Sequence, residues 1–314
     1  MEGASTNAVV SELNIYPVKS CRGISVPAAK LSSTGFDWDR QWMVVNPKGR
    51  FLTQRQVPMM ALIEVSLPIE ALDQNRGPLR PDSALCLKAP GMEPLRVLLN
   101  PPGRREKVPA SVWKWSGHAL DEGSTAAEWF SRYFGKPGTR LVRFDSVGAT
   151  RPTDPDYAVG YKVAFSDGYP ILLVSRASLD ALNERLPEPL PMNRFRPNIV
   201  VKGCDAFAED VWSKFEIGGN GASFLGVKLC SRCKVTTTNQ TTAEVGKEPL
   251  ESMRSFRLGQ LLSPAPQMKG QVYFGQNVVF DRRDGAESTV AVGDEVHVLK
   301  QAASVTEVMA KAGA

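Results

Sequence analysis

The chain has 314 residues, of which 42% are hydrophobic, so it can bury the core of one large domain or of two modest ones. Its net charge of +5 is too small to indicate nucleic-acid binding, and no nucleic-acid recognition motif is visible. No apolar run approaches the roughly 20 residues that a bilayer-spanning helix needs. A small anionic ligand in a basic pocket is the simplest explanation of the surplus positive charge.

The N-terminus lacks the features of a targeting segment. It has an acid at position 2, no early arginine and no apolar stretch of the signal-peptide type. The chain has five cysteines, an odd number without regular spacing, which is typical of a reducing compartment: Cys21, Cys86, Cys204, Cys230 and Cys233. The sequence therefore predicts a soluble protein of the cytoplasm.

The first hundred residues predict short strands separated by turns. Strands are expected over residues 9–16, 42–45, 61–67 and 85–87, because apolar and β-branched residues gather there between turn residues. The stretch over residues 99–109 is rich in Pro, Gly and Arg, which indicates a surface loop and a candidate domain boundary.

The rest of the chain mixes helices with further strands. Residues 125–134 predict a helix with Thr125 and Glu128 as a capping box and Gly135 at its end, and residues 177–186 predict a second helix. Strands are expected over residues 169–174, 198–201, 224–229, 234–238, 272–280 and 296–299. The prediction is an α+β, strand-rich fold built on barrels or a twisted sheet.

Two cysteines three residues apart, Cys230 and Cys233 in "KLCSRCKVTTTNQ", permit several kinds of chemistry. A redox pair works best at the start of a helix, whereas a β-branched run follows here. A zinc site needs more ligands, and no second closely spaced pair exists. Two ordinary buried thiols remain an alternative. One thiolate that binds a metal or an electrophile is another, and Arg232 and Lys234 would favour the anion.

Four other stretches carry donors suited to an anion: "YPVKSCRG", "FDWDRQW", "FSDGYP" and "NRFRPNIVV". Each also has a plain structural explanation, such as a solvated lysine, an arginine paired with a carboxylate, or a turn. The candidate binding residues in them are Lys19, Ser20, Arg40, Ser166, Asp167, Gly168, Arg196 and Asn198. Taken together they indicate a bulky anionic cofactor whose reactive centre lies on a cysteine.

These stretches, with "DRQWMVV", "CSRCKVTTTNQTT", "KEPLESMRSFR" and "FGQNVV" in the same order, resemble the MOSC-domain proteins, and among them the amidoxime-reducing component family, in a short form of plant or algal type. The resemblance covers about residues 9–300. It implies an N-terminal β-barrel-like domain, placed at residues 1–120, and a MOSC domain of the β-barrel type with a few helices at residues 121–314, with its core at about 155–300.

The resemblance also implies a cofactor, which is molybdenum on molybdopterin. The second cysteine of the pair, Cys233, would then be the metal ligand and catalytic residue, and Cys230 a neighbour. Soft thiolate ligation suits molybdenum. The eight binding residues named above resemble the family's cofactor contacts, and Asn277 would line the same site.

The reaction implied by the resemblance is the reduction of N-hydroxylated compounds, such as amidoximes, hydroxylamines and N-hydroxylated bases, from N–OH to N–H. Electrons would come from cytochrome b5 and an NADH-dependent cytochrome b5 reductase, and the chain has no nucleotide or haem motif of its own. The alternative is a molybdenum cofactor carrier or sulfur-transfer protein that uses Cys233. No pyridoxal-phosphate domain of the kind found in cofactor sulfurases precedes the barrel.

Overall fold

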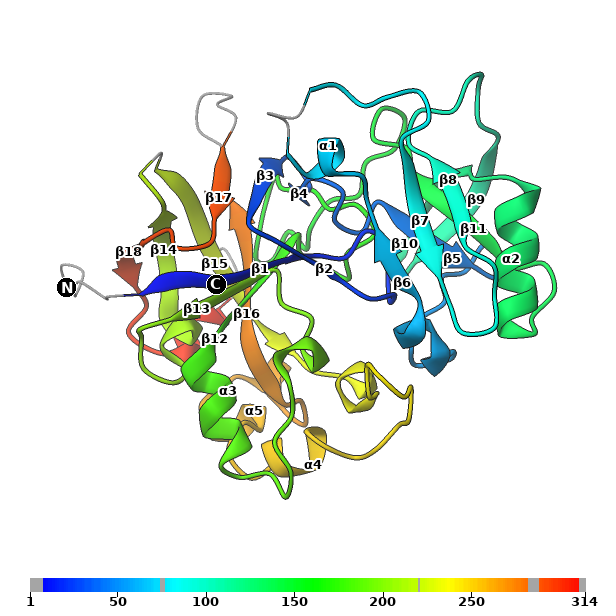
Figure 1. Ribbon diagram of the computed structural model, residues 1–314. Coiled ribbons are helices and arrows are strands. Elements are labelled where there is room, and N and C mark those ends of the chain that lie inside the picture. Colours follow the sequence, from blue (N-terminus) through cyan, green and yellow to red (C-terminus); the bar gives the residue numbers. More distant parts are fainter. Residues whose placement is uncertain (1–7, 74–76, 220, 282–287, 311–314) are drawn as a thin grey trace.

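The computed structural model describes residues 8–73, 77–219, 221–281 and 288–310. Residues 1–7, on which part of the targeting argument rests, lie outside this set. Figure 1 shows two lobes, one built around a long curled sheet and the other around the smaller sheets that carry α2. The strand-rich α+β fold is confirmed.

The large sheet has eight strands in the order β18-β14-β15-β16-β12-β13-β1-β2. Their bounds are β18 Val296–Gln301, β14 Trp212–Ile217, β15 Ala222–Ser231, β16 Tyr273–Phe280, β12 Ile171–Ser175, β13 Ile199–Lys202, β1 Val9–Ile15 and β2 Ile24–Val26. The first strand of the chain thus lies in the sheet of the C-terminal elements, where β1 pairs antiparallel with β13.

The other strands of the described residues form three smaller sheets. The four-stranded sheet is β5 Trp42–Val45, β11 Arg140–Phe144, β10 Trp115–Asp121 and β9 Lys107–Val112. One three-stranded sheet is β17 Thr289–Ala291, β3 Ala28–Ser32 and β4 Gly35–Phe36, and the other is β6 Glu64–Ser66, β7 Ala84–Lys88 and β8 Leu95–Leu98. The predicted division at residue 120 stays a prediction.

The helices are short, and most lie around the large sheet (Figure 1). The α-helices are α1 Ile69–Leu72, α2 Ser124–Phe134, α3 Arg176–Asn183, α4 Leu250–Met253, α5 Gly259–Leu262 and α6 Val305–Val308. The 3-10 helices are η1 Pro58–Leu62, η3 Met192–Arg194, η4 Ala208–Val211, η5 Lys234–Thr237 and η6 Pro266–Met268.

Helix α2 shows where local sequence signals held and where they failed. It buries Trp129, Phe130 and Tyr133 along one face, and Gly135 ends it in the left-handed conformation, as predicted. The predicted capping box is wrong, because the helix begins after Gly123 and no side chain caps it. The packing of the aromatic face, rather than a cap, stabilises this helix.

Two predicted strands are replaced wholly or partly by 3-10 helix. Lys234–Thr237 form η5 where a strand was predicted over residues 234–238, because the hydroxyls of Thr236 and Thr237 donate to the carbonyls of Cys233 and Lys234 and stabilise a helical turn. This removes the objection that a strand follows the cysteine pair. Over residues 61–67 only β6 is a strand, since η1 occupies the first part.

A buried ion pair braces the large sheet. Arg257 Nη2 lies 2.5 Å from Asp210 Oδ2, and both side chains are almost fully buried. Arg257 also donates to the Tyr273 carbonyl at the start of β16. Removing one partner would leave an uncompensated charge in the interior, which is costly.

We therefore expect Arg257→Met to lower the free energy of unfolding by about 3–5 kcal/mol. Urea unfolding followed by circular dichroism measures this change. The control is Arg22→Met. It breaks the ion pair with Glu64, which is more exposed than the Arg257–Asp210 pair, and it should lower the free energy of unfolding by no more than about 1 kcal/mol. Equal losses in the two variants would contradict the role of the buried pair.

Candidate functional site

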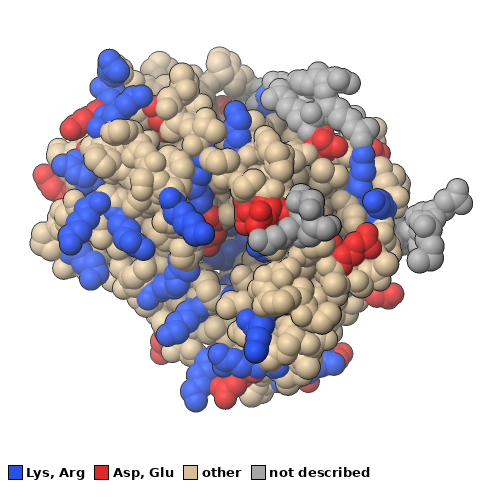
Figure 2. All heavy atoms as spheres, turned by 180° about the vertical axis from the view of Figure 1, so that it is seen from behind, with Lys and Arg blue, Asp and Glu red and all other residues tan. Residues whose placement is uncertain are grey.

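A cavity between the two lobes gathers every candidate site residue that the sequence suggested. Its lining includes Lys19, Ser20, Arg40, Ser166, Asp167, Gly168, Arg196, Asn198, Asn277 and Cys233. These residues come from the segment between β1 and β2, the turn after β4, the loop before β12, the segment just before β13, from β16 and from the segment after β15. In Figure 2 a hollow opens near the middle of one face, with Lys and Arg side chains in it and beside it.

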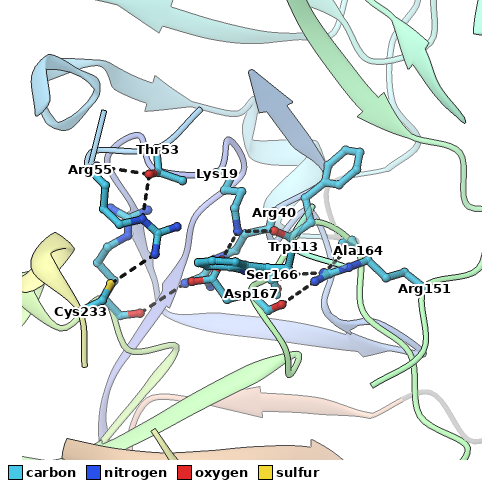
Figure 3. A network of polar contacts seen from close by, with 12 residues as sticks. Lys19, Arg40, Thr53, Arg55, Trp113, Arg151, Ala164, Ser166, Asp167 and Cys233 are labelled. Carbon is cyan, nitrogen blue, oxygen red and sulfur yellow. Dashed lines mark hydrogen bonds and ion pairs between the residues drawn. The ribbon is translucent and has the colours of Figure 1, made fainter. Parts of the chain in front are cut away.

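Lys19 lies at the centre of the polar network in Figure 3. Its Nζ donates to Asp167 Oδ1 at 2.5 Å and to the Phe165 carbonyl at 2.8 Å. Burial lowers the pKa of Lys19 to about 8, although the Asp167 carboxylate opposes this shift. Removal from bulk water would raise the pKa of Asp167, but Lys19 and the indole of Trp113 hold it well below its ordinary value. Lys19 can therefore exchange its proton near neutral pH.

The loop with Ser166, Asp167 and Gly168 is held from behind by a buried arginine. Arg151 donates to the carbonyls of Ala164, Ser166 and Asp167, so its guanidinium fixes three backbone groups at once (Figure 3). The Ser166 hydroxyl is buried and has no hydrogen-bond partner. A buried hydroxyl without a partner in a cavity wall is a ready donor to a ligand.

Two arginines of the cavity lining enclose the ring of Tyr16. The guanidinium carbons of Arg40 and Arg196 lie 4.2 and 4.3 Å from the Tyr16 ring centroid. Arg40 Nη1 contacts both oxygens of the buried Asp39, so the structural pairing considered for this arginine is present, and the same nitrogen donates to Asn198 Oδ1 at 3.0 Å. Burial lowers the pKa of Arg196 to about 10, and its Nη2 has no partner. Arg196 thus has free hydrogen-bonding capacity for an anion.

The backbone is strained in the same cavity lining. Ser20, Arg40 and Arg196 adopt left-handed conformations with φ of 69°, 48° and 57°, which side chains other than Gly rarely take. Each such residue costs on the order of 1–3 kcal/mol and persists only where its surroundings impose it. Three strained residues in one cavity wall are typical of a ligand site.

The two cysteines have different partners. Cys233 Sγ lies 3.7 Å from Arg55 Nη1, whereas Cys230 Sγ lies 3.0 Å from Arg232 Nη1. The sequence suggested that Arg232 and Lys234 would favour a thiolate in this pair, and the structure places Arg232 against Cys230. Burial raises the pKa of Cys230, and Arg232 opposes that shift. Cys233 is thus the thiol with a cation reaching it from the other lobe.

Sequence reasoning missed Thr53, Arg55, Trp113 and Arg151, which complete the site (Figure 3). None of them lies in a stretch with a recognisable binding motif. They come from segments that are far apart in the sequence, around residues 53–55, 113 and 151. The left-handed backbone of Trp113, with φ of 54°, marks a tight turn between β9 and β10 that no local pattern announces. Within the described residues, no group of three or more His, Cys, Asp and Glu side chains is arranged to hold a metal ion.

The sequence of the chain is similar to those of known proteins. Residues 7–137 match the MOSC N-terminal beta barrel domain, and residues 160–297 match the MOSC domain. Mitochondrial amidoxime reducing component 2 of Rattus norvegicus is 37% identical over 79% of this chain and 72% of its own length. The chain belongs to the amidoxime-reducing component family of MOSC-domain proteins.

Other members of the family span more of the chain. Mitochondrial amidoxime-reducing component 1 of Mus musculus is 34% identical over 93% of this chain and 82% of its own length. Mitochondrial amidoxime-reducing component 1 of Homo sapiens is 33% identical over 93% of this chain and 83% of its own length. Membership in this family implies an oxidoreductase. Among the helices formed by the described residues, none has the length and apolar character needed to cross a membrane.

The shifted pKa of Lys19 makes anion binding in this cavity pH-dependent. Lys19 is a cation below about pH 8 and loses its charge above it. We expect sulfate, whose own charge is constant near neutral pH, to bind the cofactor-free chain more weakly as the pH rises through 8. Isothermal titration calorimetry between pH 6 and about 9.5 measures this change.

Lys19→Met should remove the pH dependence and weaken sulfate binding throughout. The matched control is Lys107→Met, which breaks another Lys–Asp contact, 2.6 Å long, outside the cavity. A Lys107→Met variant that loses the pH dependence, or a Lys19→Met variant that keeps it, would contradict the assignment.

Proposed function

We propose that this chain is a molybdenum-cofactor-dependent reductase of N-hydroxylated compounds, with Cys233 as metal ligand. One observation carries the proposal: the Cys233 thiol shares a single cavity with Lys19, Arg40, Arg55 and Arg196. A soft ligand surrounded by hydrogen-bond donors suits a metal on an anionic organic carrier. Family membership supports the same conclusion.

The residues present fit such a cofactor. Ser166 Oγ and Arg196 Nη2 are buried without partners, so both have hydrogen bonds to give. Lys19 and Arg196 would hold the phosphate and pterin by charge-assisted hydrogen bonds, and Cys233 would hold the metal. Arg151 would act through the backbone, since it fixes the loop that presents Ser166.

The bound cofactor would supply the two electrons of the reaction. An amidoxime, two electrons and two protons give an amidine and one water, as the N–O bond breaks and an N–H bond forms. The residues of the cavity lining would orient the reactants. Arg55 holds the Cys233 sulfur in place by its contact at 3.7 Å, and hydrogen bonds to a ligand sulfur tune the potential of its metal.

Electrons would come from a cytochrome b5 that is reduced by an NADH-dependent cytochrome b5 reductase. The net charge of +5 and the Lys and Arg side chains around the hollow in Figure 2 suit an acidic partner. The proposed site of action, the cytoplasm, stays a prediction, and the relatives named above are called mitochondrial.

Electrostatic docking of this kind has a measurable signature. We expect the rate of benzamidoxime reduction with cytochrome b5 and its reductase to fall as ionic strength rises from about 0.01 M to 0.15 M, where the Debye length shrinks from about 30 to 8 Å. Stopped-flow kinetics of cytochrome b5 oxidation separates this step from chemistry. A rate that is independent of salt would rule out steering.

The ligand role of Cys233 is tested by replacing it with alanine. The wild-type chain should contain nearly one molybdenum per chain, measured by mass spectrometry, and Cys233→Ala should lose this metal. The reduction of benzamidoxime by the variant should fall to background. The matched control is Cys86→Ala, which changes a thiol in β7 outside the cavity lining. Cys230→Ala should keep metal, since Cys230 contacts Arg232 instead.

The outcomes separate the candidate functions. Full activity in Cys233→Ala, with loss in Cys230→Ala, would reverse the assignment of the two cysteines. A wild-type chain that binds the cofactor but reduces no N-hydroxylated compound, and that carries a persulfide on Cys233, would support the carrier or sulfur-transfer alternative.

A further inference from the structure

Arg55 carries a positive charge in the cavity lining and forms no ion pair among the described residues, although its charge helps to lower the pKa of Asp167. Arg55 lines the cavity, and its Nε donates to Thr53 Oγ1 at 3.2 Å. Its other polar contact is the Cys233 sulfur, and none of the ion pairs among the described residues includes Arg55. Lys19 and Arg40, in contrast, each contact an aspartate.

The position of Arg55 is fixed by an aromatic ring. Its guanidinium carbon lies 4.4 Å from the ring centroid of Trp113, a cation–π contact. Trp113 is itself held, because its Nε1 donates to Asp167 Oδ1 at 3.0 Å, and its side chain is 48% exposed. Figure 3 shows Arg55 beside Cys233 at one end of the network, with Lys19 and Trp113 nearer its middle. Arg55 thus covers one face of the Trp113 ring.

The chemistry of N-reduction changes the charge of the bound molecule. The electron-withdrawing oxygen makes an amidoxime or a hydroxylamine a weak base that is neutral at pH 7. The corresponding amidine or alkylamine is a strong base and takes up a proton. A fixed cation beside the reacting centre therefore tolerates the substrate and repels the product.

We propose that Arg55, held on Trp113, is a specificity-determining residue that keeps cationic reduction products from rebinding, so that the site favours neutral N-hydroxylated forms of strong bases. This inference rests on the proposed function for the identity of the reaction. In this proposal the site distinguishes the substrate from the product by their charge. For substrates whose products stay neutral, Arg55 does not weaken the binding of the product.

Binding measurements on the cofactor-loaded chain test this inference apart from turnover. Benzamidine is the cationic probe, and benzamide is a neutral molecule of nearly the same shape. We expect Arg55→Met to lower the Kd of benzamidine about tenfold, because repulsion is lost and the Trp113 face is uncovered, while the Kd of benzamide changes little. Isothermal titration calorimetry gives both constants.

Two further variants separate charge from shape and from general surface effects. Arg55→Lys keeps the charge and should bind benzamidine as weakly as the wild type does. Arg185→Met removes another arginine stacked on a ring, 4.7 Å from the Phe256 centroid and outside the cavity lining, and should change neither constant.

The inference is overturned if Arg55→Met binds benzamidine no tighter than the wild type, or if it tightens benzamide equally. The same tightening in Arg55→Lys would show that shape decides instead of charge. Failure of the wild-type chain to reduce benzamidoxime would contradict the proposed function alone. The ratio of the benzamidine Kd values of the wild type and Arg55→Met would still decide the role of Arg55.

Discussion

The buried carboxylate of Asp39 ties together the segments on which the site depends. It accepts hydrogen bonds from the Tyr16 backbone at 2.8 Å, from Asn198 Nδ2 at 3.0 Å and from Arg40. These partners lie at the end of β1, the start of β13 and the turn after β4. Because desolvation raises the pKa of Asp39 and Arg40 opposes it, the carboxylate needs all its donors to remain buried. The strained backbone of Arg40 and Arg196 is held by this arrangement.

The site divides its work between two walls. One wall, with Arg196, Ser166 and Lys19, offers donors that the fold leaves partly unsatisfied. The other wall, with Cys233, Arg55 and Trp113, combines a thiol with a cation fixed on a ring. The first suits a bound anion, and the second controls what approaches the sulfur. Residues that touch no ligand, such as Arg151, keep the first wall in shape.

Sequence motifs singled out residues that the structure gathers in one cavity, because each sits in a short stretch whose composition is unusual, and their binding roles stay a prediction. They predicted the local structure less well. The run after Cys233 is β-branched, yet Thr236 and Thr237 close a helical turn with their own hydroxyls. Helix α2 was found from its aromatic face, whereas its start was misjudged because no side-chain cap exists. Propensity is a weak guide wherever side chains satisfy the backbone locally.

The sequence by itself determined the strand-rich class, the family resemblance and the set of candidate donors, since these depend on residue type and order. Only the tertiary structure decided which cation reaches which thiol. Arg232 lies one residue from Cys233 yet contacts Cys230, and Arg55, distant in the chain, contacts Cys233. Neighbours in sequence on an extended segment point to different sides, so contacts across the cavity depend on how the two lobes meet.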